Sequence, residues 1–543
     1  MDSMIVQTLK FGIILSSPVL FYSCVSTQNR GTTEAENPSV FVVEEGSLDQ
    51  SATVEGRTVS DLPPLLPLLP LPPLPTIPRE FRGVWIATVK NADWPSRQDL
   101  TSAEQQAELR AMFDRARDLN LNAIIFQVRS MADAFYASEL EPWSVFLNGK
   151  QGRAPDPFYD PLEFAIEEAH ARGLELHAWF NPFRANIEGE VEEFAENHVA
   201  RTEMVVSYGV YSWLDPGNAD ARLHSLNVAA DILNRYDIDG FHMDDYFYPY
   251  PTTSESGGDV AFPDDASWTE SSAAKDGMDR DEWRRQNVDD FVRDLQQIIR
   301  ACKPWVKFGI SPFGIWQPGY PEGTVGFNPH DKLYADSRKW LMNGWVDYLT
   351  PQLYWSIDSP GQSYPRLLSW WTEQNRMGRH LWPGNFTSRI TLTGEQYWNA
   401  EELLNQLRIT RETPNAGGNT HFRMISLMPA SHGMGDQLKE KLYQNPALIP
   451  ASPWLSGRSL PTPQLRTSDD GKRITAVLQD VNPLDVKQWL VRELRGDAWH
   501  LRIIPGGTDV LTIVVDNTVR AVAFSVIDRI CREGVVAYEN LFR

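Results

Sequence analysis

The chain has 543 residues, of which 42% are hydrophobic and 22% are charged. It is too long for one ordinary domain, and its composition is that of a soluble globular protein. The formal net charge of −22 argues against nucleic acid as a partner, because phosphate backbones require basic surfaces. The three cysteines do not make a disulfide framework or a metal cluster.

Residues 1–23 resemble an export signal. Lys10 precedes an apolar run over residues 11–22, which has about the length of a signal-peptide core and is too short to span a bilayer. Ser23 and Cys24 follow directly, and this pair resembles a bacterial lipoprotein signal in which Cys24 becomes the lipidated N-terminus. We therefore expect lipidation at Cys24, with secretion without a lipid as the alternative.

Residues 24–78 are expected to tether the domain that follows and to space it. The part up to residue 61 is rich in Ser, Thr, Glu and Gly without periodicity, which indicates disorder. The proline–leucine tract over 62–78 predicts an extended polyproline II segment, on the order of 50 Å long at ~3.1 Å per residue. A lipid and this tether would hold the next domain away from a membrane. The alternative for the tract is a ligand of proline-recognition domains.

Residues 79–446 alternate short apolar runs with amphipathic helices eight times. The expected strands lie at 81–88, 122–129, 174–181, 238–244, 306–313, 346–353, 380–385 and 422–427. The expected helices lie at 103–119, 160–172, 220–236, 283–301, 331–343, 362–377, 395–411 and 435–444. Strands that alternate with helices require right-handed crossovers and a parallel sheet, so eight units predict an α/β fold of the (β/α)8 TIM-barrel type. A doubly wound open sheet is the alternative, but no Gly-rich phosphate turn follows the first strand.

Beyond a Pro-rich segment, residues 460–543 change to short alternating runs separated by turn residues. The expected strands lie at 473–479, 486–493, 498–505, 509–515, 519–527 and 535–538. This pattern predicts a small all-β sandwich of the fibronectin-III or immunoglobulin kind. It carries no evident catalytic cluster, so we interpret it as a spacer or stabilising flank, with a sugar-binding or partner-binding module as the alternative.

The stretch over residues 239–249 begins as a buried strand and ends in two carboxylates. Side chains alternate along a strand, so Phe241 and Met243 share the face that packs on helices. His242 and Asp244 share the other face, which points into the barrel and toward its catalytic rim. Adjacent aspartates at the end of such a strand are costly to bury without a function. We therefore predict that Asp244 is a catalytic carboxylate.

The same alternation places polar side chains at the carboxyl ends of three further strands. Active sites of TIM barrels lie at this end, and amide, guanidinium, imidazole and phenol groups suit sugar hydroxyls. Exposed indole rings suit the faces of sugars. The predicted substrate-binding residues are Gln127, Arg129, His177, Trp179, Asn181, Arg184, His242, Tyr246, Trp316, Gln352, Tyr354 and Trp355. Trp85 has the opposite parity and is expected to pack.

No cofactor or metal is expected at this rim. His177, His242 and Asp244 match no metal-ligand spacing, although two histidines and one carboxylate are enough for zinc. A zinc site therefore remains an alternative.

Several motifs, in this order, resemble the glycosyl-hydrolase-like family 10, also called the domain-of-unknown-function 187 family. They are Arg82-Gly83-Val84-Trp85, Gln127-Val128-Arg129, Ala178-Trp179-Phe180-Asn181-Pro182, residues 239–249, Gly309-Ile310-Ser311-Pro312-Phe313-Gly314 and Pro351-Gln352-Leu353-Tyr354-Trp355. The resemblance implies a (β/α)8 barrel in an exported bacterial protein, often a lipoprotein. The family includes an enzyme that cuts peptidoglycan glycan strands stripped of their stem peptides. The implied partner is thus a carbohydrate polymer in the cell envelope, and a lipid anchor is the only implied contact with a membrane.

Residues 240–244 also resemble the fourth strand of α-amylase-type barrels, with His242 in place of arginine. This resemblance implies that Asp244 is a nucleophile or a transition-state stabiliser. The acid that amylases carry after the fifth strand is absent, because residues 311–314 hold no carboxylate.

Glycoside hydrolysis generally needs two carboxyl groups, of which one stays protonated to assist the leaving group. Asp245 is the candidate that we favour for the second, with Asp264 and Glu322 as alternatives. A chitinase-like, substrate-assisted route ranks lower, because Tyr246 stands where that motif needs its acid. A glycan-binding lipoprotein without turnover is the rival function.

Overall fold

The structure is a computed structural model that describes residues 71–541, apart from residue 255. The export signal, Cys24 and most of the expected tether lie outside the described residues. From Thr76 onward the chain forms one compact unit. In the described part, no helix is both long enough and apolar enough to pass through a membrane.

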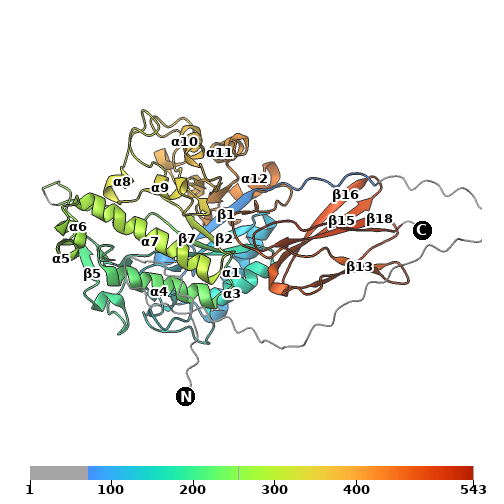
Figure 1. The fold of residues 1–543 in the computed structure, drawn as a ribbon, viewed down its shortest axis with the longest axis horizontal. Coiled ribbons are helices and arrows are strands. Elements are labelled where there is room, and N and C mark those ends of the chain that lie inside the picture. The colour runs from blue at the N-terminus through green and yellow to red at the C-terminus, as the bar shows by residue number, and fades with distance from the viewer. Residues whose placement is uncertain (1–70, 255, 542–543) are drawn as a thin grey trace, which may run out of the picture. The chain divides into compact units, whose positions relative to one another are not determined.

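A closed ring of parallel strands forms the centre of the larger domain. In Figure 1, helices lie above and below these strands. Its strands are β1 (Phe81–Ile86), β2 (Ala123–Arg129), β3 (Glu175–Phe180), β7 (Gly240–Met243), β8 (Lys307–Ile310), β9 (Tyr348–Leu349), β10 (His380–Leu381), β11 (Gly384–Asn385) and β12 (Gly418–His421). β10 pairs with β9 and β11 pairs with β12, so the single stretch 380–385 joins both ends of the sheet. β1 also pairs with β12, which closes the ring and confirms the (β/α)8 barrel.

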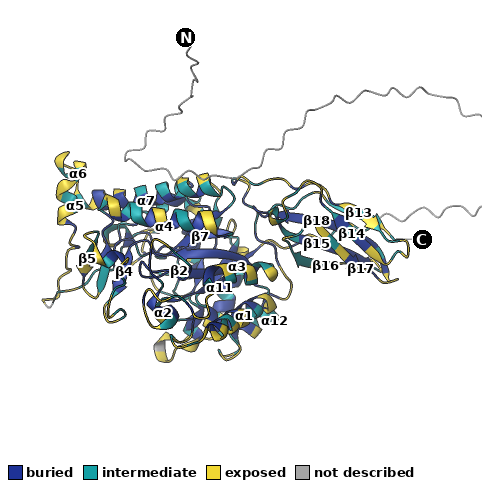
Figure 2. Ribbon diagram, turned by 90° about the horizontal axis from the view of Figure 1, so that it is seen from below, coloured by how far each residue is buried: buried dark blue, intermediate teal, exposed yellow. Residues whose placement is uncertain are grey.

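Helices surround the ring and bury their apolar faces against it. The main ones are α1 (Ser102–Asp118), α3 (Pro161–Ala171), α4 (Ala219–Arg235), α7 (Arg280–Cys302), α9 (Ser337–Met342), α10 (Tyr364–Gln374), α11 (Ala400–Glu412) and α12 (Met434–Lys441). Several of them begin at a capping residue: Thr101 and Glu104 form a capping box on α1, and Asp160 precedes Pro161 on α3. In Figure 2 the barrel strands are dark blue, whereas exposed residues follow the outer sides of helices such as α7.

The last barrel strand differs from the prediction. The expected strand at 422–427 is wrong, because Met424–Leu427 forms a 3-10 helix and β12 lies earlier. β12 is polar, and two of its side chains form hydrogen bonds inside the protein: Asn419 donates to Oδ1 of Asn385 at 2.7 Å, and His421 lies 3.1 Å from the Tyr443 hydroxyl. An apolar pattern could not identify a strand of this kind.

Two further differences lie in the connections. The helix expected at 331–343 is two short helices, α8 (Pro329–Lys332) and α9. A small antiparallel sheet of β4 (Arg184–Ile187), β5 (Val205–Tyr208) and β6 (Tyr211–Leu214) follows β3 and was not predicted. The remaining short helices in these loops are α2 (Val145–Asn148), α5 (Asp265–Glu270) and α6 (Ser272–Lys275).

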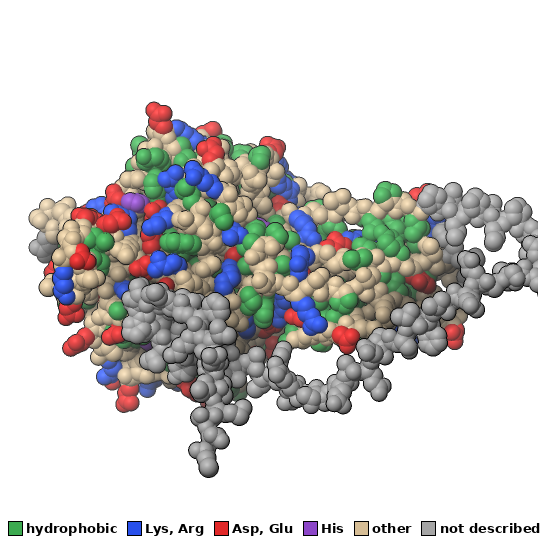
Figure 3. Space-filling model, viewed as in Figure 1, with side chains coloured by type: hydrophobic (Ala, Val, Ile, Leu, Met, Phe, Trp, Pro, Cys, Tyr) green, Lys and Arg blue, Asp and Glu red, His purple; other side chains and the backbone are tan. Residues whose placement is uncertain are grey.

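The smaller domain is a sandwich of two antiparallel sheets, as predicted. Its strands are β13 (Gln464–Thr467), β14 (Arg473–Val477), β15 (Val486–Arg495), β16 (Ala498–Pro505), β17 (Val510–Val514), β18 (Val519–Asp528) and β19 (Ala537–Asn540). The sheets have the orders β13-β14-β17 and β16-β15-β18-β19, and Trp489 and Phe524 lie in the core between them. β13 was not predicted. On the face of the molecule in Figure 3, acidic and basic side chains are interspersed.

A column of buried polar side chains runs inside the barrel. Lys307 Nζ donates to Glu175 at 2.7 Å, and the other oxygen of Glu175 lies 3.0 Å from Nε2 of His177. Nδ1 of His177 and Nδ1 of His242 both contact the Tyr348 hydroxyl, at 2.8 and 3.0 Å. Each polar group therefore has a partner, as burial requires.

Two glycines make room for this column. A Cβ at Gly240 would lie 2.4 Å from the ring of His177, and a Cβ at Gly309 would lie 1.9 Å from the ring of Tyr348. Only glycine leaves the space that these rings occupy.

The β-sandwich covers the amino-terminal end of the barrel. Lys487 forms an ion pair with Asp239, and Arg529 Nη2 lies 2.7 Å from Asp237. The thiol of Cys531 donates to Glu175 at 3.2 Å, at the base of the polar column. Apolar residues of the two domains pack around these contacts, among them Phe81, Trp382, Leu490 and Ile527.

We predict that Gly309→Ala destabilises the protein by about 3 kcal/mol or more, because the new methyl group overlaps a ring that the column holds in place. A lower unfolding temperature measures the loss. Gly258→Ala is the control, since its nearest neighbour atom lies 3.9 Å from the added Cβ and the site is exposed. Equal melting of both variants would contradict this account of the barrel interior.

We predict that Lys487→Met costs about 3 kcal/mol of folding free energy, because it removes a cation from a buried carboxylate. Burial raises the pKa of Asp239, but the charges of Lys487 and His170 outweigh burial and hold it well below its usual range. Thermal unfolding measures the loss, and Lys472→Met is the control at an exposed site of the same domain. If the two variants are equally stable, the ion pair does not hold the domains together.

Candidate active site

Asp244 follows β7 and points into the barrel mouth, as the strand alternation predicts. Its carboxylate accepts hydrogen bonds from Trp179 Nε1 at 3.1 Å, from Asn181 Nδ2 at 2.7 Å and from the amide of Tyr246 at 3.2 Å. Burial raises the pKa of Asp244 above its usual value, and the charge of Arg184 and the bond from Asn181 oppose this rise in part. These donors surround the anionic form of Asp244.

The donors of Asp244 are themselves held in place. Gln127 Nε2 donates to the Asn181 side-chain oxygen at 2.7 Å, so the Asn181 amide nitrogen faces Asp244. The Gln127 oxygen accepts from the amides of Thr88 and Val89, each at 2.9 Å. A chain of hydrogen bonds thus runs from the end of β1 through β2 and β3 to the carboxylate after β7.

Asp245 turns to the same side as Asp244 because the strand has already ended. The Tyr250 hydroxyl donates to Oδ2 of Asp245 at 2.5 Å, and Gln352 is a second hydrogen-bond partner. Burial and the adjacent charge of Asp244 raise the pKa of Asp245 to about 7. No described residue forms an ion pair with it. Asp245 is therefore the carboxyl of the pair that keeps a proton near neutral pH.

The mouth has a polar half and an aromatic half. Gln127, Trp179, Asn181 and Arg184 lie on the β1–β3 side, where the Arg184 guanidinium lies 4.7 Å from the ring centre of Tyr246. Half-buried aromatic rings follow the other strands: Tyr246, Tyr250, Phe313, Phe327, Tyr354, Trp355, Phe386 and Phe422.

Neighbouring rings in the aromatic half contact one another. Phe327 lies 5.2 Å from Tyr250 and 5.4 Å from Phe313, and Phe386 lies 4.8 Å from Tyr354. Burial and the charge of Asp245 raise the pKa of Tyr354. Five of these rings were not predicted from the sequence. Phe313, Phe386 and Phe422 lie within three residues of a strand end, which is the signal that could have identified them, whereas Tyr250 and Phe327 lie further along their loops.

The prediction that Arg129 binds substrate is wrong. The pairing of β2 with β3 shifts by one residue between Gln127 and Arg129, so Arg129 leaves the inward face. Its guanidinium forms a fully buried pair with Glu141 at 2.7 and 2.5 Å and lies over the ring of Phe180. It stabilises the fold and does not line the mouth.

His177 and His242 face inward but lie below the mouth, so neither is placed to bind substrate. His177 belongs to the polar column. Nε2 of His242 contacts Trp85 Nε1 at 3.2 Å and Ser311 Oγ at 3.0 Å, and burial and the nearby His177 hold the pKa of His242 well below its usual range. Trp85 therefore points into the barrel, contrary to its expected packing role.

Trp316 is also not a sugar platform. Its indole nitrogen donates to Asp336 at 2.9 Å, its ring stacks on Trp370, and 8% of its surface is exposed. The alternatives to Asp245 fail as well: Glu322 is exposed on a loop, and Asp264 is buried between Arg280 and Arg284.

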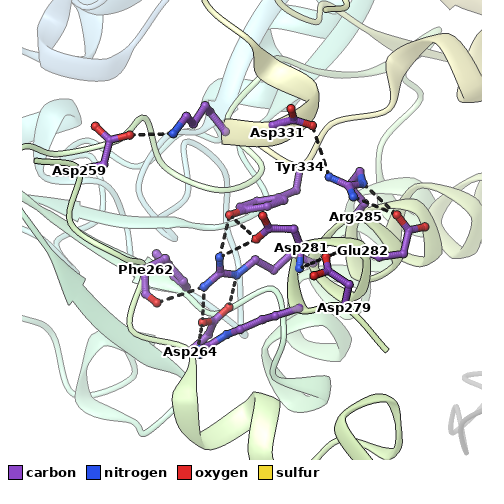
Figure 4. A network of polar contacts seen from close by, with 12 residues as sticks. Asp259, Phe262, Asp264, Asp279, Asp281, Glu282, Arg285, Asp331 and Tyr334 are labelled. Atoms are coloured by element: carbon purple, nitrogen blue, oxygen red, sulfur yellow. Dashed lines mark hydrogen bonds and ion pairs between the residues drawn. The ribbon is translucent and has the colours of Figure 1, made fainter. Parts of the chain in front are cut away.

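Figure 4 shows the surroundings of Asp264. Both nitrogens of the Arg284 fork donate to its carboxylate at 2.7 Å, and Arg284 also donates to the Tyr334 hydroxyl at 2.7 Å. This network anchors the far end of the loop that begins with Asp244. Over the described residues, no three His, Cys, Asp or Glu side chains are arranged to hold a metal ion.

We predict that Asp245→Asn raises the unfolding temperature by several degrees at pH 8 and leaves it unchanged near pH 4. The folded chain raises the pKa of Asp245 from its usual 3.8 to about 7, so the folded state loses stability as pH rises through 7, and asparagine escapes this loss. Thermal unfolding at both pH values measures it. The exposed Asp497→Asn should show no such difference, and a less stable Asp245→Asn at pH 8 would contradict the assignment.

Comparisons with known proteins agree with this geometry. The model of the family described as glycosyl hydrolase-like 10 matches residues 80–398. "Glycosyl hydrolase YngK" of Bacillus subtilis (strain 168) is 39% identical over 405 residues, which cover 73% of this chain and 78% of that protein. "Glycosyl hydrolase DigH" of Escherichia coli (strain K12) is 32% identical over 371 residues, covering 63% and 82%.

Among solved structures, the PgaB (BpsB) glycoside hydrolase domain from Bordetella bronchiseptica aligns at 14% identity with a TM-score of 0.44. The alignment covers 66% of this chain and 99% of that one. The match of the family model and the identity to its relatives lead to one conclusion: the chain belongs to the glycosyl hydrolase-like 10 family and is a glycoside hydrolase.

Proposed function

We propose that the enzyme cleaves O-glycosidic bonds in peptidoglycan glycan strands that have lost their stem peptides. The catalytic part of this proposal rests on the different surroundings of the Asp244 and Asp245 carboxyl groups. Asp244 has donors and a nearby guanidinium that favour its anion, while Asp245 is buried beside that anion and keeps its proton. Such a pair supplies the two groups that glycoside hydrolysis requires. The glycan itself is inferred from the family resemblance.

In this mechanism Asp245 protonates the oxygen of the glycosidic bond as that bond breaks. Positive charge then develops at the anomeric carbon, and the Asp244 carboxylate stabilises it. Gln127 and Asn181 are fully buried and orient the Asp244 carboxylate, and Arg184 lies beside them. Tyr354 and Trp355 offer ring faces on the aromatic half of the mouth.

We also propose that the enzyme works in the bacterial cell envelope. The export signal of residues 1–23 and the lipidation expected at Cys24 would anchor it to a membrane through lipid alone. The tether up to residue 78 would let the barrel reach the wall. The site needs no cofactor for the proposed reaction.

We predict that Asp244→Asn and Asp245→Asn each lower turnover of amidase-treated peptidoglycan by about 10²–10⁴-fold. Released fragments measure turnover, and the exposed Asp497→Asn is the control. Activity of the wild type should fall as pH rises through about 7, because Asp245 then loses the proton that it must donate.

Three outcomes separate the alternatives. Fragments released from stripped but not from intact peptidoglycan support the proposed substrate. Binding of stripped strands without fragments favours a glycan-binding lipoprotein. Full activity of both aspartate variants rejects the assigned residues.

A further inference from the structure

Tyr250 is placed to control one oxygen of the proton donor. It lies five residues after Asp245, on the loop that follows β7, and its hydroxyl lies 2.5 Å from Oδ2 of Asp245. This is one of the shortest side-chain hydrogen bonds around the two acids. It becomes stronger when Asp245 loses its proton, because the acceptor is then charged.

The ring of Tyr250 is held on two sides. Its centre lies 5.2 Å from that of Phe327, which comes from the loop after β8, and 6.1 Å from that of Tyr246 in an edge-on contact. Tyr246 is in turn covered by the guanidinium of Arg184 at 4.7 Å. The direction of the Tyr250 hydroxyl is thus fixed by packing, which is what a positioning residue requires.

We propose that Tyr250 is the positioning residue of the general acid, and that it presents the proton of Asp245 on Oδ1. This inference rests on the proposed function. A hydroxyl that donates to Oδ2 uses that oxygen as its acceptor, so the proton of the neutral carboxyl is carried by the other oxygen, Oδ1.

The bond changes during proton transfer from Asp245 explain why the hydrogen bond from Tyr250 assists the reaction. The Oδ1–H bond of Asp245 breaks, an O–H bond forms on the glycosidic oxygen, and the bond from that oxygen to the anomeric carbon breaks with its electron pair going to oxygen. Asp245 becomes a carboxylate. The hydrogen bond from Tyr250 strengthens as this charge develops, so it stabilises the transition state more than the ground state.

The groups that face Asp245 set the direction of a pH effect. They are Asp244 and Tyr246 beside it, Tyr250 across the loop, and Gln352 and Tyr354 after β9. Burial and Asp244 raise the pKa of Asp245, whereas the bonds from Tyr250 and Gln352 lower it. Removal of the Tyr250 hydroxyl should therefore raise this pKa further.

The test compares Tyr250→Phe with Tyr208→Phe in the purified protein. Tyr208 also supports this loop, since its hydroxyl donates to the Val260 carbonyl at 2.7 Å, but it makes no bond to Asp245. We expect Tyr250→Phe to lower kcat/KM on stripped glycan strands about 10- to 100-fold and to move the alkaline limb of the pH profile upward by about one unit. Tyr208→Phe should leave both unchanged.

Two further measurements exclude a merely structural effect. Aryl glycosides of the same oligosaccharide, whose leaving groups need no proton, should restore most of the activity of Tyr250→Phe. Fluorotyrosine at position 250, a stronger donor of the same shape, should move the alkaline limb downward. The inference is overturned if Tyr250→Phe loses as much activity on aryl glycosides as on glycan strands. It is also overturned if neither Tyr250→Phe nor fluorotyrosine at position 250 moves the alkaline limb of the pH profile.

The inference can fail while the proposed function stands. If Asp245→Asn is inactive and Tyr250→Phe behaves as wild type, only the role of Tyr250 is rejected. If Asp245→Asn retains full activity, the assignment of the acid fails, and with it this inference.

Discussion

The site depends on the cost of burying two adjacent carboxyl groups at one end of β7. Asp244 and Asp245 are each 4% exposed, and like charges this close cannot both ionise easily. The protein favours ionisation of only one of the two carboxyl groups by giving them different surroundings, and no cationic side chain of the described residues lies between them. Asn181 and Trp179 hydrogen-bond the Asp244 carboxylate, and Tyr250 and Gln352 hydrogen-bond Asp245. Because the pair titrates as a unit, Asp244, which has more hydrogen-bond donors and a nearby guanidinium, keeps the charge, and Asp245 keeps the proton.

The rigid barrel holds the different surroundings of Asp244 and Asp245 in place. Beneath the mouth, Trp85 and Ser311 each form a hydrogen bond with Nε2 of His242. Below them the column continues through Tyr348 and His177 to the contact with the β-sandwich. A polar interior of this kind is stable only when every member has a partner. The β-sandwich supplies part of the last layer, so it acts as a structural part of the barrel even though it is far from the acids in sequence.

The sequence allowed the barrel, the sandwich and the inward direction of Asp244 to be predicted, because alternation along a strand is a local property. The position of Arg129 was mispredicted because the pairing of β2 with β3 shifts by one residue, and the sequence pattern does not indicate such a shift. His177 was misplaced for another reason: alternation gives the face of a strand but not the depth along the barrel axis. Tyr250 was missed because its role depends on how a loop folds back onto the residue after the strand.

A comparison between Asp245 and Asp264 shows what distinguishes an acid that reacts from one that supports the fold. Both are buried aspartates on the same loop, and sequence alone could not rank them decisively. Asp264 lies between two guanidinium groups, which balance its charge and fix the end of the loop. Asp245 faces another carboxylate and a phenol instead, so its charge is expensive in the resting enzyme. Because ionisation of Asp245 is unfavourable, this residue keeps its proton and can donate it. The ion pairs of Asp264 fix the end of the same loop and so help to hold Asp245 in these surroundings.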